Sequence, residues 1–82
     1  MANSTDPIAI AIKQIMKEKG VLQGAVAKRA GFSEKRFSNM MNDRQVIRAC
    51  DLFPISQALG VVIPVILAEG KKALSDSEQK AG

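Results

Sequence analysis

The chain has 82 residues and a net charge of +4, and 46% of its residues are hydrophobic. Its length supports one small domain rather than two independent cores, and its apolar content is too high for a disordered tail. It contains a single cysteine and no histidine, which excludes an internal disulfide and a zinc site. We therefore expect neither a metal nor a cofactor.

The first helix is predicted to start at Pro7 and to stop at Gly20. Asp6 is a good helix cap, and proline suits the first helical position, where its missing N–H costs nothing. Apolar residues then recur at the spacing i, i+4, i+7 and i+8, which gives the helix one apolar face: Ile8, Ile12, Ile15 and Met16. This periodicity predicts a core helix.

Two short helices, over about residues 23–30 and 33–42, are predicted to meet at a tight turn. Gly31 closes the first, because glycine enters the left-handed conformation without steric cost. Ala27 is small enough to let the two helices cross closely. These features are what a helix-turn-helix requires, although a generic helical hairpin also remains open from them.

The second helix of this pair has distinct faces. Phe37, Met40 and Met41 are spaced i, i+3 and i+4 and predict its buried side. Steps of about 100° per residue place hydrogen-bonding residues on the opposite side or its flanks: Lys35, Arg36, Ser38, Asn39 and Asn42. Ser33 is the expected cap, and Glu34 lies near the positive end of the helix dipole.

The C-terminal half is predicted less sharply. Because proline is tolerated only in a first turn, Pro54 favours a fourth helix that starts near Asp51 rather than near Arg48, or one that is kinked. Gly60 ends it, and a short fifth helix is expected from about residue 63 or 64 to Glu69. Residues 1–70 would form the domain, and residues 71–82 a polar, mobile tail that frays or extends the fifth helix weakly.

Residues 61–67 carry more apolar surface than a short final helix buries easily. Part of this surface could pack under the first helix. Alternatively, it could form a homodimer contact, whose expected residues are Val62, Ile63, Val65, Ile66 and Leu67. Both alternatives remain open from the sequence.

Positive charge is concentrated around the predicted helix pair. Residues 13–48 contain nine basic residues and three acidic ones, a net charge of +6, whereas the remainder of the chain sums to −2. Such a concentration favours phosphate attraction. Lysine-rich helical faces are also common on solvated surfaces, so the coincidence of charge and motif is the stronger argument.

With these elements in place, the chain resembles the lambda-repressor and Cro-like helix-turn-helix domains over about residues 8–67. The segments that carry the resemblance are IKQIMKEKG, then VLQGAVAKRAGFSEKRFSNMMNDR, and the weaker DLFPISQALGVVIPVILAEG. The resemblance implies an all-α, compact five-helix DNA-binding domain with its helix-turn-helix at helices two and three.

The resemblance also implies site residues. Those expected to read base edges are Glu34, Lys35 and Asn39, and those expected to meet the DNA backbone are Gln23, Lys28, Ser33, Arg36, Ser38, Asn42 and Arg44. Several positions depart from the family pattern. Leu22 replaces the usual polar cap of the second helix and Gly24 lies inside that helix, and each departure costs about 1 kcal/mol. Asp43 stands where the family has a turn glycine.

We therefore predict a bacterial or phage transcriptional regulator, most often a repressor in this family, that binds double-stranded DNA as a homodimer. There is no room for a separate small-molecule domain. The alternative is an antitoxin-like or coactivator-like protein-interaction module on the same fold. An enzyme is disfavoured, because the chain has no histidine, no phosphate-binding glycine loop and no carboxylate pair fixed by spacing.

The sequence also predicts a cytoplasmic protein without a membrane anchor. The N-terminal residues MANSTDP are polar and lack the apolar run of a signal peptide. The most apolar run, residues 61–68, contains Pro64 and is far shorter than the roughly 20 residues needed to cross a bilayer. The lone Cys50 is expected to be a buried or half-buried small hydrophobe rather than a reactive thiol.

Overall fold

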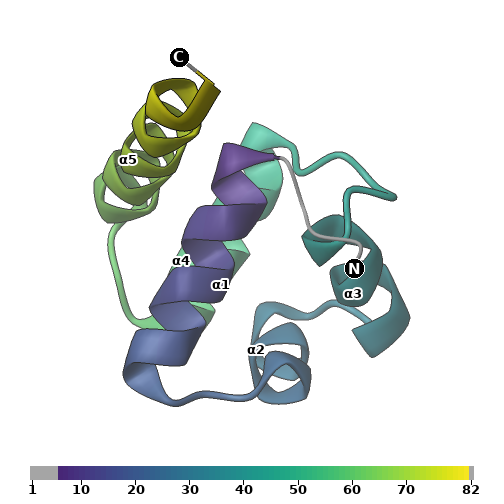
Figure 1. Ribbon diagram of the computed structural model, residues 1–82. Helices are drawn as coiled ribbons and strands as arrows, with labels where there is room; N and C mark the ends of the chain where they lie inside the picture. Colours follow the sequence, from purple (N-terminus) through teal and green to yellow (C-terminus); the bar gives the residue numbers. More distant parts are fainter. Residues whose placement is uncertain (1–5, 82) are drawn as a thin grey trace.

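The computed structural model describes residues 6–81, with side chains described for residues 6–74. Residues 1–5, on which the signal-peptide prediction rests, and Gly82 of the predicted tail lie outside the described residues. The helices are α1 (Pro7–Lys19), α2 (Gln23–Ala30), α3 (Glu34–Met41), α4 (Ala49–Leu59) and α5 (Ile63–Ala81) (Figure 1). Over residues 6–81 the chain forms helices and turns without a strand, so the all-α prediction is confirmed.

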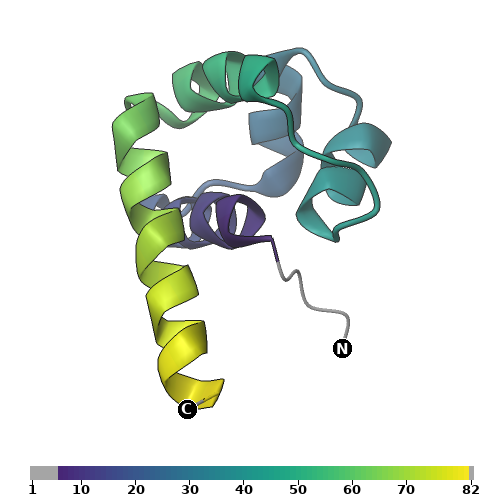
Figure 2. The ribbon, with the colours of Figure 1, turned by 90° about the horizontal axis from the view of Figure 1, so that it is seen from above.

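Helix α1 lies at the centre of the arrangement. It packs against α5 on one side and contacts α3 on the other, while α2 packs against α4 and α3 (Figures 1 and 2). The largest fully buried side chains come from all five helices: Ile12, Val26, Phe37, Met40, Met41, Ile55 and Ile66. One aliphatic and methionine-rich core with a single fully buried aromatic residue therefore holds the helices together.

The residues predicted to begin and end the first helix do so in the structure. The Asp6 carboxylate accepts a hydrogen bond from the backbone N–H of Ile8 at 2.9 Å, and Pro7 is the first residue of α1. Gly20 ends α1 in the left-handed conformation with φ of 68°. Both predicted ends of the first helix are confirmed.

Helix α4 starts earlier than predicted. It begins at Ala49 with Arg48 as its cap, so the expected start near Asp51 is wrong and Pro54 lies inside the helix. The reason is that the Asp51 carboxylate accepts the backbone N–H of Arg48 at 3.0 Å and closes the first turn. Cys50 falls on the outer side of that turn and is exposed, which corrects the expectation that it is buried.

Helix α5 is longer than predicted. It continues through Gly70 to Ala81 instead of ending at Glu69, so the proposed domain boundary at residue 70 does not coincide with a helix end. Gly70 is buried against α1, where an added Cβ would lie 3.3 Å from the carbonyl oxygen of Pro7. This glycine serves close helix packing rather than helix termination.

The apolar run in α5 divides between core and surface. Ile66 is fully buried and Ile63 packs half-buried against the core, whereas Val62, Val65 and Leu67 are 63%, 42% and 47% exposed. Ile66 cannot reach a second copy without leaving the core, so its place in the expected dimer contact is corrected. Packing in the core therefore applies to Ile66 and Ile63, and the homodimer contact stays a prediction for the exposed residues.

Within residues 6–81, no single helix is long and apolar enough to cross a membrane. The segments Ala49–Leu59 and Ile63–Leu74 reach the necessary length and hydropathy only as a pair, and they bend by 105° where they meet.

The burial pattern predicts a large difference between two apolar truncations. Ile66→Ala removes a fully buried side chain and should lower the free energy of unfolding by about 2–5 kcal/mol. Val46→Ala, at a loop position that is 76% exposed, should change it by less than about 0.5 kcal/mol. Urea denaturation of both variants measures these values, and similar losses in the two would contradict the packing of α5.

Candidate nucleic-acid interface

The turn between α2 and α3 has the predicted geometry. Gly31 closes α2 with φ of 85°, and the backbone N–H of Phe32 bonds to the carbonyl of Ala27 at 2.9 Å. Leu22 provides no side-chain cap at the start of α2, as its apolar side chain requires. The helix-turn-helix therefore rests on the glycine turn and on packing rather than on a polar cap of α2.

Helix α3 is fixed at its start and along one side. The Ser33 hydroxyl accepts the backbone N–H of Arg36 at 3.1 Å, which is the expected cap. Phe37, Met40 and Met41 are fully buried, so the predicted inner side is confirmed. The opposite side of the helix must then face solvent.

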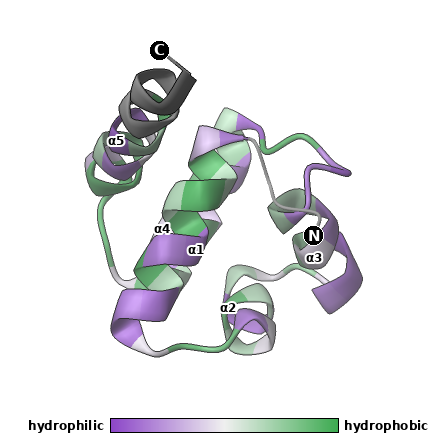
Figure 3. Cartoon of the chain, in the orientation of Figure 1, coloured by the Kyte–Doolittle hydropathy of each residue, from purple (hydrophilic) through white to green (hydrophobic). Residues whose placement is uncertain are grey.

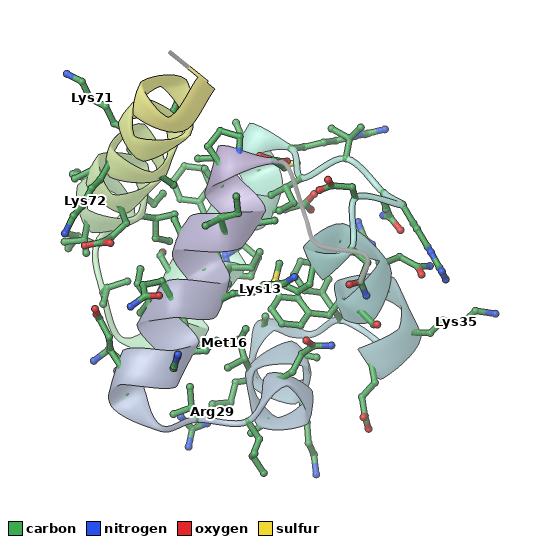
Figure 4. The ribbon with its side chains drawn as sticks, viewed as in Figure 1. Lys13, Met16, Arg29, Lys35, Lys71 and Lys72 are labelled. Atoms are coloured by element: carbon green, nitrogen blue, oxygen red, sulfur yellow. The ribbon has the colours of Figure 1, made fainter. Side chains whose placement is uncertain are left out.

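The outer face of α3 is polar (Figure 3). Lys35 is exposed and projects away from the body of the protein (Figure 4). Asn39 follows one helical turn later and is half-buried. Among the residues that the structure describes, neither side chain has a hydrogen-bond partner. Lys35 and Asn39 are therefore available to an external ligand.

The C-terminal end of α3 organises the following turn. The carbonyl of Asn39 accepts the backbone N–H groups of Arg44 at 2.8 Å and Gln45 at 3.2 Å. Asp43 adopts the left-handed conformation with φ of 61°, at the position where the resemblance expects glycine. These bonds hold Arg44, which is exposed, beside the end of α3.

Two predicted backbone contacts, Ser38 and Asn42, interact with each other. The amide nitrogen of the Asn42 side chain donates to the carbonyl of Ser38 at 2.8 Å and lies 3.3 Å from its hydroxyl.

Gln23 and Lys28 are both exposed on α2, at its first residue and in its last turn.

Glu34 leans towards α2 instead of projecting with Lys35. A Cβ added to Gly24 would lie 3.2 Å from a carboxylate oxygen of Glu34. Gly24 therefore leaves room for this carboxylate beside the first turn of α2, which carries a positive partial charge and lacks a side-chain cap. The sequence showed Gly24 only as a helix-weakening residue, because the contact depends on how α2 and α3 cross.

Arg36, another predicted backbone contact, faces α4. Its guanidinium lies 3.5 Å from the carboxylate of Asp51 and 4.8 Å from the ring centre of Phe32. Sequence reasoning missed Asp51 because it placed the start of α4 two residues too late. Asp51 lies three residues after the cap Arg48, where an acidic side chain closes a capping box. This spacing was the feature of the sequence that could have predicted the earlier start of α4.

Solved structures share this arrangement. The clp gene regulator ClgR from Corynebacterium glutamicum matches with a TM-score of 0.82 and 19% identity, covering 93% of this chain and 82% of that one. The restriction-modification controller protein C.Esp1396I matches with a TM-score of 0.80 and 21% identity, covering 87% and 92%. The same controller, as a tetramer in complex with its natural 35 base-pair operator, matches with a TM-score of 0.77 and 22% identity, covering 83% and 90%.

This chain has the fold of those regulators. The predicted compact five-helix fold, with its helix-turn-helix at α2 and α3, is confirmed by this likeness. No family model and no curated protein matches the sequence. At identities near 20%, the likeness extends to the fold, and the side chains of the site must be argued on their own.

The contact between Gly24 and Glu34 predicts a stabilising substitution. Gly24→Ala should raise the free energy of unfolding by up to about 1 kcal/mol, because alanine favours the helix and the Glu34 side chain can move away from the new methyl group. Gly20→Ala, at φ of 68°, should instead lower it by about 1–2 kcal/mol. Thermal unfolding of both variants checks this, and a destabilised Gly24→Ala protein would show that the α2–α3 contact cannot adjust.

Proposed function

We propose that this protein is a sequence-specific DNA-binding transcriptional regulator that places α3 in the major groove. The observation that carries the proposal is the polar outer face of α3, with Lys35 and Asn39 free of internal partners in the described part of the chain. The neighbour bound to its operator supports the use of this fold on DNA. The further assignment as a repressor rests on the family resemblance.

The side chains on this face suit base edges. Lys35 can donate to the O6 and N7 atoms of guanine, and the Asn39 amide can pair with N6 and N7 of adenine. Glu34 can accept from N4 of cytosine once it leaves its place beside α2. Each such contact is worth about 1–3 kcal/mol of discrimination between bases.

The surrounding residues suit the DNA backbone. Gln23, Lys28 and Arg44 are exposed around α3. Ser33 and Asn42 cap its two ends, and Ser38 lies within the helix beside the Asn42 side chain. Phosphate contacts of this kind set the register of a protein on DNA without reading sequence. The net +6 of residues 13–48 supplies the attraction that brings the protein to the duplex.

Dimerisation through α5 completes the proposal. Val62, immediately before α5, and Val65 and Leu67, near the start of α5, are exposed apolar residues, and Ile63 is half-buried beside them. A two-fold dimer would set two copies of α3 about one DNA turn, roughly 34 Å, apart. One small module buries little surface on DNA, so a second copy adds the affinity that a single one lacks.

The same apolar stretch favours a second candidate function. A protein-interaction module of the antitoxin-like or coactivator-like kind would use Val62, Val65 and Leu67, together with the half-exposed Leu74, to hold another protein. The two functions differ in what α3 does, because only a DNA-binding protein needs Lys35 and Asn39.

The deciding experiment is selection of genomic DNA fragments by the purified protein at about 0.1 M salt, followed by sequencing. We expect an enriched palindrome whose half-sites lie about one helical turn apart. A Lys35→Ala/Asn39→Ala double variant is the control and should enrich no motif. General, salt-sensitive binding without a motif in the wild-type protein would contradict the proposal and favour the interaction module.

Single substitutions separate base reading from backbone binding. Asn39→Ala should weaken binding to the selected site by about 1–3 kcal/mol and change binding to a random duplex little. Gln23→Ala and Arg44→Ala should weaken both, because phosphate contacts do not depend on sequence. Fluorescence anisotropy titrations measure the affinity of each variant for the selected site and for the random duplex. An equal loss of affinity for both duplexes in Asn39→Ala would contradict its base-reading role.

A further inference from the structure

The buried carboxylate of Asp51 has a partner on the recognition helix. Asp51 is 7% exposed and is one of two buried polar residues in the described part of the chain. One carboxylate oxygen accepts the backbone N–H of Arg48, and the other lies 3.5 Å from the guanidinium of Arg36. The start of α4 is thereby joined to the flank of α3.

Arg36 is held from a second direction as well. Its guanidinium lies 4.8 Å from the ring centre of Phe32, and that ring stacks on the fully buried Phe37 at 6.3 Å with an interplanar angle of 11°. A cation placed over an aromatic ring and beside a carboxylate has lost much of its freedom to turn outward. Its side chain is still 45% exposed, so solvent and ions reach it.

We propose that Asp51 limits the charge-driven affinity of this protein for DNA by withholding Arg36 from the DNA backbone. This inference rests on the proposed DNA-binding function. Asp51 is a positioning residue that touches no base or phosphate. It neutralises one guanidinium on the flank of α3 and leaves Lys35 and Asn39 to face the groove.

The physical basis is the different dependence of the two binding modes on charge. Non-specific binding comes almost entirely from phosphate neutralisation, and each neutralised phosphate steepens the fall of log K with log salt by about 0.9. Specific binding adds base contacts that do not scale with this charge. Withholding one guanidinium therefore removes one phosphate contact from both binding modes. The general affinity and the salt slope fall, and the base-dependent difference between the selected site and other DNA is kept.

The test uses Asp51→Asn, whose side-chain oxygen can still accept the Arg48 N–H while the negative charge is gone. On a random-sequence duplex, between about 0.05 and 0.2 M salt, we expect tighter binding and a salt slope steeper by up to about 0.9. The ratio of affinities for the selected site and the random duplex should stay the same, because a phosphate contact acts on both. A lost structural contact alone would weaken binding without steepening the slope.

Matched variants identify the group responsible. Arg36→Gln alone should leave the slope unchanged, because its charge is already withheld, and Arg36→Gln/Asp51→Asn should return the slope to the wild-type value. Glu69→Gln removes another carboxylate, a half-buried one that lines the groove between α1 and α5 outside residues 13–48, and should leave the slope unchanged.

An unchanged slope in Asp51→Asn, or a slope flattened by about 0.9 in Arg36→Gln, would overturn the inference while leaving the DNA-binding function in place. The Arg36→Gln result decides the question by itself if thermal unfolding shows that Asp51→Asn does not fold. Absence of all DNA binding by the wild-type protein would overturn both the inference and the function on which it rests.

Discussion

The burial of Phe37 is the constraint on which the rest of the site depends. Its side chain is fully buried, with Met40 and Met41 beside it, so the core sets the rotation of α3 about its axis. Turning the helix by one residue would expose this ring and press Arg36 or Ser38 towards the interior, where an unpaired polar group is costly. The outward direction of Lys35 is therefore a consequence of core packing.

The first three helices could be predicted because their ends are set by neighbouring residues. Asp6 caps α1 through a bond to a residue two positions along the chain, and Ser33 caps α3 three positions along. Gly31 closes α2 by its own left-handed conformation. Such contacts lie within a few residues, so the sequence alone contains their cause. The polar and buried faces of α3 followed from the helical period for the same reason.

The later helices were predicted less well because their limits depend on contacts between helices. The fifth helix was expected to end at Glu69, but the missing side chain of Gly70 lets α5 approach α1, and this approach is visible only after folding. Pro54 read as a sign of a late start, whereas the Asp51 carboxylate secures an earlier one. In the site, the position of Glu34 beside Gly24 and the turn of Arg36 towards α4 are tertiary contacts that no helical period could predict.

These tertiary contacts change the electrostatic character of the interface. By sequence, Lys35 and Arg36 form a basic pair at the start of α3, opposed by Glu34. In the folded protein, the Asp51 carboxylate pairs with the Arg36 guanidinium. Glu34 lies beside the first turn of α2, where a phosphate would also be attracted. Both carboxylates thus reduce the general attraction of this surface for a polyanion. Under the proposed DNA-binding function, the remaining affinity then depends less on charge that every stretch of DNA satisfies equally and more on groups proposed to read bases.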